Sequence, residues 1–222
     1  MTEKPYYIVP HCTQEAKILY EDEALLIVDK PDLLLSVPGR APENKDCLIT
    51  RLQKTHPTAT IVHRLDLDTS GLMIIPLQKE VHSHISRQFQ ERQVKKEYIA
   101  IVYGNLKVNK GEINFPLIAD WPNRPKQIVD YGRGKSALTH YEVIERDPKR
   151  PATKVLLRPT TGRTHQLRLH FKAIHHPILG CDMYAHDEAL NMSERLLLHA
   201  SSLSFTHPLS GQIMTHSCEA DF

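Results

Sequence analysis

The chain has 222 residues, 41% of them hydrophobic, and a formal net charge of only +2, from 28 Lys and Arg against 26 Asp and Glu. A chain of this length can form one large domain or two small lobes with a sizeable core. Its four cysteines form no C-x-x-C pair, which argues against a structural zinc site or a disulfide framework and is typical of a reducing compartment. It shows neither a signal peptide nor a long apolar run, so we expect a cytoplasmic protein that is not inserted in a membrane.

The first predicted elements alternate with loops. Residues 1–16 are expected to be a lead-in to a single folded domain that spans 17–222. Ala24–Val28 is an apolar run, which predicts a buried strand. A short helix is predicted at 48–54, and 71–76 predicts a second buried strand that ends at a proline.

Residues 79–92 have a helical period instead. Val81, Ile85 and Phe89 recur at four-residue spacing, which places one apolar stripe along an amphipathic helix. Strands dominate the rest and show no regular βαβ alternation, so we expect an α+β fold around a mixed, mainly antiparallel central sheet. The later predicted elements are strands at 98–103, 139–144, 154–157 and 196–205 and a helix at 166–174.

A polar segment with two carboxylates, His63–Gly71, lies between two apolar stretches and is expected to be a loop that enters a strand. A carboxylate in such a place could act as a nucleophile, as a general base, or as a turn or capping residue. Local chemistry alone favours the turn, because Asp, Ser and Gly are all frequent in turns.

This segment and four others, in the same order, resemble the RluA family of RNA pseudouridine synthases. The signature of that family is His-Arg-Leu-Asp followed by Thr-Ser-Gly, as found here at 63–66 and 69–71. The resemblance runs from about Lys30 to the C-terminus, which is nearly the whole chain. The four further elements are Lys95–Tyr98, Gly162–His170, His176–Gly180 and Leu197–Ala200.

The resemblance implies a pseudouridine synthase fold in two lobes with a basic catalytic cleft. Only about 20 residues precede the first strand, too few for the S4 RNA-binding domain of larger relatives. The implied reaction breaks the N-glycosidic bond of a uridine and rejoins the base through carbon, so it needs neither a redox cofactor nor a metal. The sequence agrees, because it has no glycine-rich phosphate loop and no zinc-ligand spacing.

The resemblance also assigns three catalytic residues. Asp66 is the implied catalytic carboxylate, Arg168 its ion-pair partner, and Tyr98 the residue that stacks on the target base. A guanidinium suits the second role, because it is always charged and its planar fork can bind both carboxylate oxygens. From residue type alone, Arg168 could instead be a solvated helix arginine, and Tyr98 an ordinary core tyrosine.

Other candidate residues are expected to contact RNA. Flipping the target uridine out of the RNA stack costs a few kcal/mol. Arg64 would fill the gap that the flipped uridine leaves. His63 would contact the RNA backbone or only fix its loop, and Trp121 would stack on RNA or lie in the core. The candidates for phosphate contacts are Arg40, Arg87, Arg92, Lys95, Lys96, Arg124, Lys126 and Arg163.

Three segments, 36–40, 120–127 and 220–222, narrow the resemblance to family members that modify both 23S ribosomal RNA and the anticodon stem-loop of transfer RNAs (tRNAs). The alternatives are a synthase for only one RNA and a catalytically silent RNA-binding protein of the same fold. We expect a monomer with no obligate protein partner. Two departures from the family pattern, at Asp32–Leu33 and at Cys181–Asp182, are expected not to touch the chemistry.

Overall fold

The computed structural model describes residues 8–222, which form two compact units. The first unit contains the chain up to Val94 together with Leu203–Cys218, and the second contains Lys95–Ser202 and Glu219–Phe222. No helix in this described part of the chain has the length and apolar character that crossing a bilayer requires. Of the expected lead-in, residues 1–7 lie outside the described residues, and 8–16 contain neither helix nor strand.

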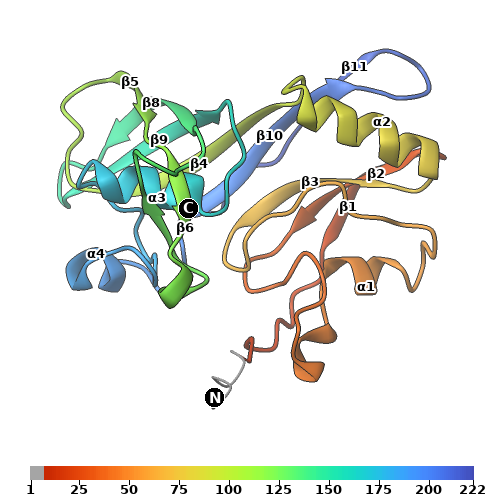
Figure 1. Cartoon of the computed structure of the whole chain (residues 1–222), viewed down its shortest axis with the longest axis horizontal. Coiled ribbons are helices and arrows are strands. Elements are labelled where there is room, and N and C mark those ends of the chain that lie inside the picture. Colours follow the sequence, from red (N-terminus) through yellow and green to blue (C-terminus); the bar gives the residue numbers. More distant parts are fainter. Residues whose placement is uncertain (1–7) are drawn as a thin grey trace. The chain divides into compact units, whose positions relative to one another are not determined.

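The first unit contains a small sheet with a helix on each side (Figure 1), in which the pairs β1–β2 and β2–β3 are antiparallel. Its strand order is β1, β2, β3 and the C-terminal half of β10, and β11 also pairs with β10. The strands are β1 (Lys17–Glu21), β2 (Leu25–Lys30), β3 (Ser70–Pro76), β10 (Leu198–Thr206) and β11 (Ile213–Ser217); the helices are the 3₁₀ turn η1 (Pro42–Lys45), α1 (Leu48–Leu52) and α2 (Lys79–Gln90).

Strand β3 is buried along its whole length, because both faces of this sheet are covered. On one face, Val81 and Ile85 of α2 share a buried cluster with Ile27 and Ile74 of the sheet. Helix α1 lies on the other side (Figure 1). Strands that are covered on both faces have continuous rather than alternating apolar residues, and this explains the two apolar runs in the sequence.

The second unit contains the longer strands. Its strand order is the N-terminal half of β10, then β4, β9, β8 and β5, and the pairs β4–β9, β8–β9 and β5–β8 are antiparallel. Phe171 of helix α3 is fully buried in a cluster with Val102 and Val155 of this sheet. A separate antiparallel hairpin consists of β6 and β7. The elements are β4 (Lys95–Tyr103), β5 (Lys110–Asn114), β6 (Leu117–Ala119), the 3₁₀ turn η2 (Trp121–Asn123), β7 (Gln127–Val129), β8 (Leu138–Arg146), β9 (Ala152–Pro159), α3 (Gln166–Ala173) and α4 (Asp187–Asn191).

The predicted α+β fold with a mainly antiparallel sheet is confirmed. Each helix and strand predicted from the sequence is present, with ends shifted by a few residues. The sequence analysis did not predict the short or exposed elements β1, β5, β6, β7, β11 and α4.

Candidate active site

Asp66 lies in a tight turn directly before β3. The Thr69 N–H donates to the Asp66 carbonyl at 3.2 Å, which closes the turn. The Asp66 side chain is half-buried, whereas that of Arg64 is exposed. The expected loop at the entrance of a strand is therefore present, and it holds a carboxylate at the surface of the first unit.

Two buried polar side chains fix the backbone on either side of Asp66. The Ser36 hydroxyl donates to the Leu65 carbonyl at 2.9 Å and accepts from the Leu65 N–H at 3.2 Å. The Lys30 ammonium donates to the Leu67 carbonyl at 3.2 Å and to the Leu34 carbonyl at 2.7 Å. These contacts hold the turn in place without using the Asp66 carboxylate. Sequence reasoning missed both supports, and the only signal for Lys30 was a lysine at the end of an apolar run.

His63 fixes the start of the same segment. Its Nε2 accepts a hydrogen bond from the Ile74 N–H of β3 at 2.9 Å, and its ring lies 4.5 Å from that of Phe89, centroid to centroid. Of the two roles expected for His63, these contacts support fixation of the loop.

Tyr98 lies in β4 of the second unit, opposite Leu157 of β9, and packs half-buried against the core of that unit. Lys96 is on the same face of the strand, because side chains alternate along β-strands. Burial lowers the pKa of Lys96 from its ordinary value. Its ammonium lies next to Gly162, where an added Cβ would be 3.6 Å away. Strand β4 thus places Tyr98 and the partly desolvated Lys96 amine on one face.

Arg168 is buried in α3, with 1% of its surface exposed. Its Nε donates to the Cys181 thiol at 3.3 Å, and its Nη2 forms an ion pair with the Asp182 carboxylate at 2.6 Å. Its guanidinium carbon also lies 5.7 Å from the centre of the Tyr184 ring. The alternative of a solvated helix arginine is therefore wrong.

The chain matches a family of known proteins over most of its length. The family model described as RNA pseudouridylate synthase matches residues 24–173. The chain belongs to the RNA pseudouridine synthase family. It is 55% identical, over 92% of this chain and 99% of the relative, to a Yersinia pestis protein named dual-specificity RNA pseudouridine synthase RluA. The Escherichia coli K12 protein of the same name is 51% identical over 92% of this chain and 93% of its own.

A solved structure supports the same conclusion. Human RNA pseudouridylate synthase domain containing 1 superposes with a TM-score of 0.77 at 27% sequence identity, over 95% of this chain and 85% of that chain. The protein is thus an RNA pseudouridine synthase of the RluA family, an isomerase.

The two departures from the family pattern interact with buried charged side chains of the chain. Cys181 and Asp182 both contact the Arg168 guanidinium. Of the charges that raise the pKa of Lys30, the Asp32 carboxylate has the largest effect. The expectation that neither departure touches the proposed chemistry is therefore wrong for Cys181–Asp182, which contact the candidate residue Arg168. The Cys181 thiol and the exposed Asp182 carboxylate together hold the buried guanidinium of Arg168.

The histidines near Arg168 support the structure of the second unit. His165 Nδ1 is 2.8 Å from the Tyr184 hydroxyl, and His170 Nδ1 is 2.9 Å from the Thr139 hydroxyl. His176 Nδ1 lies 2.7 Å from the Tyr103 carbonyl. These three rings bind protein groups and hold α3 and its flanking loops in place.

The candidate phosphate contacts are mostly exposed and belong to both units. Arg40 and Arg64 are exposed in the first unit. Arg163 is exposed in the second unit, and its Nε donates to the Ser136 carbonyl at 3.1 Å. Of the others, Lys95, Arg124 and Lys126 are exposed and Lys96 is half-buried.

Lys30 provides a test of how the Asp66 turn is supported. Burial lowers the pKa of Lys30 from 10.5 to about 8, and the carboxylates of Asp32, Asp68 and Asp66 offset part of this shift. We expect Lys30→Met to lower the free energy of unfolding by about 3 kcal/mol at pH 7, because buried carbonyls lose their donor and the carboxylates lose their counter-charge. Urea denaturation would measure the loss, with the exposed Lys54→Met as control.

The same variant has a predicted pH dependence. Folding lowers the pKa of Lys30, so between pH 8 and 10.5 the unfolded chain binds more protons than the folded synthase, and wild-type stability rises with pH there. The stability gap between wild type and Lys30→Met should therefore widen over this range, by up to about 3 kcal/mol. A gap that stays constant or narrows would contradict the assignment of a charged, desolvated amine to this position.

Proposed function

We propose that this synthase converts specific uridines to pseudouridine in two RNAs, 23S ribosomal RNA and the anticodon stem-loop of tRNAs. The similarity to proteins named dual-specificity, over 92% of the chain, is the observation that supports this proposal most strongly. The segment 120–127 is one of the three segments that resemble family members acting on both RNAs, and it forms an exposed loop of the second unit.

Asp66 is proposed to be the catalytic carboxylate. Its half-burial and the rigid backbone on both sides suit a group that must meet a flipped uridine in a fixed position, since small displacements of a reacting group lower the rate strongly. In this proposal Tyr98 stacks on the target base and Arg168 is the charge partner of Asp66. The reaction needs no cofactor and no metal, because it rearranges bonds within one nucleotide.

Arg64 is proposed to replace the flipped uridine in the RNA stack. Its exposure, two residues before Asp66, supports this role. The exposed cations Arg40, Lys95, Arg124, Lys126 and Arg163, together with the half-buried Lys96, would neutralise phosphates, so RNA affinity should fall as salt concentration rises. His63 would act through the loop that it fixes.

The proposal is tested by incubating the purified protein, with EDTA and no added cofactor, with unmodified 23S fragments and anticodon stem-loop transcripts. Pseudouridine is mapped by carbodiimide-dependent primer stops. We expect a stop at one site in each RNA. Stops in one RNA alone would leave a single-substrate synthase, and binding without stops in either RNA would leave a silent RNA-binding protein.

The proposed function includes a monomeric, cytoplasmic enzyme without an obligate protein partner. Both proposed substrates belong to the translation machinery, which supports the location. Sedimentation of the protein alone and with a stem-loop transcript tests whether the enzyme is a monomer. The expected result is one protein chain per RNA.

A further inference from the structure

The tip of the β6–β7 hairpin carries the only tryptophan of the chain, and it is not in the core. Trp121 is 69% exposed, so the alternative of a core tryptophan is wrong. An indole buries a large apolar area when it is covered, and leaving it in water forgoes that stabilisation. Tryptophan is enriched at binding interfaces, where a partner covers the ring.

The loop that presents Trp121 is rigid. The Asp120 N–H donates to the Lys126 carbonyl at 2.9 Å, and the Lys126 N–H donates to the Asn123 carbonyl at 3.1 Å. The Asn123 amide also donates to the Asp120 carboxylate at 3.0 Å. Prolines at 122 and 125 restrict the backbone further. The indole is thus held in one position before any ligand arrives, which lowers the entropy cost of binding.

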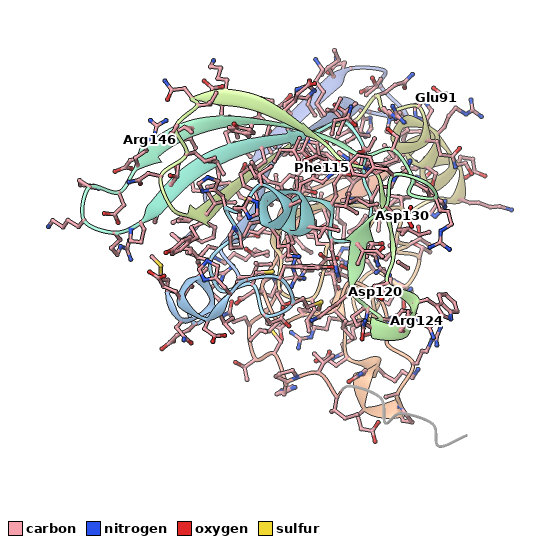
Figure 2. All side chains as sticks on the ribbon, turned by 60° about the vertical axis from the view of Figure 1, so that its left-hand side comes forward. Glu91, Phe115, Asp120, Arg124, Asp130 and Arg146 are labelled. Atoms are coloured by element: carbon pink, nitrogen blue, oxygen red, sulfur yellow. The ribbon has the colours of Figure 1, made fainter. Side chains whose placement is uncertain are left out.

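Arg124 makes the exposed indole a cationic platform. Its guanidinium carbon lies 3.8 Å from the centre of the Trp121 ring, and its Nε donates to the Trp121 carbonyl at 3.3 Å. Figure 2 shows Arg124 at the end of the hairpin, near Asp120. The guanidinium covers one face of the ring, and Trp121 remains 69% exposed, so the indole still presents a surface to a planar ligand.

The loop end of the hairpin is tied to the start of α3. The Gln127 N–H donates to the hydroxyl of buried Tyr184 at 2.8 Å, and the same hydroxyl lies 2.8 Å from Nδ1 of His165, the residue before α3. A groove of about 590 Å³ lies beside this junction, and its lining includes Lys126, Lys172 and His175 as well as Asp120. Its cationic side chains suit a polyanion that passes the platform.

We propose that Trp121 and Arg124 form a stacking platform for an unpaired base of the substrate RNA, with Lys126 and Lys172 along the groove contacting its phosphates. Aromatic rings and arginine planes are the usual surfaces on which unstacked RNA bases rest. The inference rests on the proposed function and adds a second feature by which the synthase chooses its substrate RNA. The synthase favours RNAs that offer an unpaired base at this position, in addition to the uridine that it modifies.

The single tryptophan makes the proposal directly measurable. The Asp66→Asn protein, which is expected to bind RNA without converting it, is titrated with an anticodon stem-loop transcript while tryptophan fluorescence is recorded. A base stacked on the indole should quench the emission in a saturable way. A fully paired duplex of the same length should bind without this quenching. Equal quenching by both RNAs, or none with the stem-loop at saturation, would overturn the platform.

Kinetics on the catalytically intact protein provide the second arm. Trp121→Ala should raise the KM for the stem-loop about 10-fold with little change in kcat. The KM of Trp121→Phe should lie close to that of the wild type, because phenylalanine keeps an aromatic ring at this position. The matched control is Tyr131→Ala, another aromatic side chain of the second unit, 76% exposed, which should change KM by less than about 2-fold. Thermal denaturation checks that each variant is folded.

The two arms separate this inference from the proposed function. If the wild type forms pseudouridine but Trp121→Ala has an unchanged KM, the platform is rejected and the function stands. If the stem-loop quenches the fluorescence but the wild type forms no pseudouridine in it, the platform stands and the proposed activity on this RNA is rejected.

Discussion

Replacing Asp66 by asparagine is expected to lower pseudouridine formation by more than about 1000-fold, because the reaction then lacks its catalytic carboxylate. Asparagine has the same shape, and backbone groups of Leu65, Asp66 and Leu67 form hydrogen bonds that hold the turn, so the turn should persist. RNA affinity should therefore change by no more than about 2-fold. Single-turnover conversion and filter binding, with the same transcript, measure the two effects.

Asp68→Asn is the matched control for this variant. Asp68 is also half-buried in the turn, and its charge acts on Lys30 as that of Asp66 does. Any general effect of removing a negative charge from the turn appears in both variants, whereas loss of the catalytic group appears in one. We expect Asp68→Asn to retain activity within about 10-fold of wild type. Full activity in Asp66→Asn, or equal loss in both, would contradict the assignment.

The parts of the fold that the sequence predicts are those whose burial leaves a periodic trace. Strand β3 is covered on both faces and appears as a continuous apolar run, and α2 shows its buried stripe at Val81 and Ile85. Strand β11 has only exposed and half-buried residues, and the hairpin β6–β7 has three residues per strand. Such elements are fixed by tertiary pairing, which a local pattern does not encode.

The candidate site divides in the same way. Asp66 could be found because its segment is a recognisable string, and the turn before β3 follows from its residue types. The support by Lys30 and Ser36 could not be found, since Ser36 lies 29 residues from the backbone groups that it binds. The contacts of Cys181 and Asp182 with Arg168 likewise join a loop to a helix. Pairing across such separations depends on the folded backbone rather than on sequence spacing.

Gly180→Ala is expected to lower the free energy of unfolding by about 4 kcal/mol or more. Gly180 directly precedes Cys181 and Asp182, which contact Arg168. Gly180 has φ +68, and an added Cβ would overlap the carbonyl oxygen of Arg195 and lie 2.6 Å from its carbonyl carbon. A backbone carbonyl held in the fold cannot swing away as a side chain can. Cys181 and Asp182 follow directly in the chain, so any shift that relieves the overlap also displaces the groups that hold Arg168.

Gly211→Ala isolates the steric part of that effect. Gly211 has φ +70, almost the same backbone conformation, but an added Cβ there meets nothing within 4 Å. It should therefore cost only the left-handed conformation of alanine, about 1 kcal/mol. Urea denaturation of both variants yields the difference, and equal losses would show that the close approach to Arg195 is wrong. In Gly180→Ala protein that remains folded, pseudouridine formation should fall below that of Gly211→Ala, because only the first substitution disturbs the contacts of Arg168.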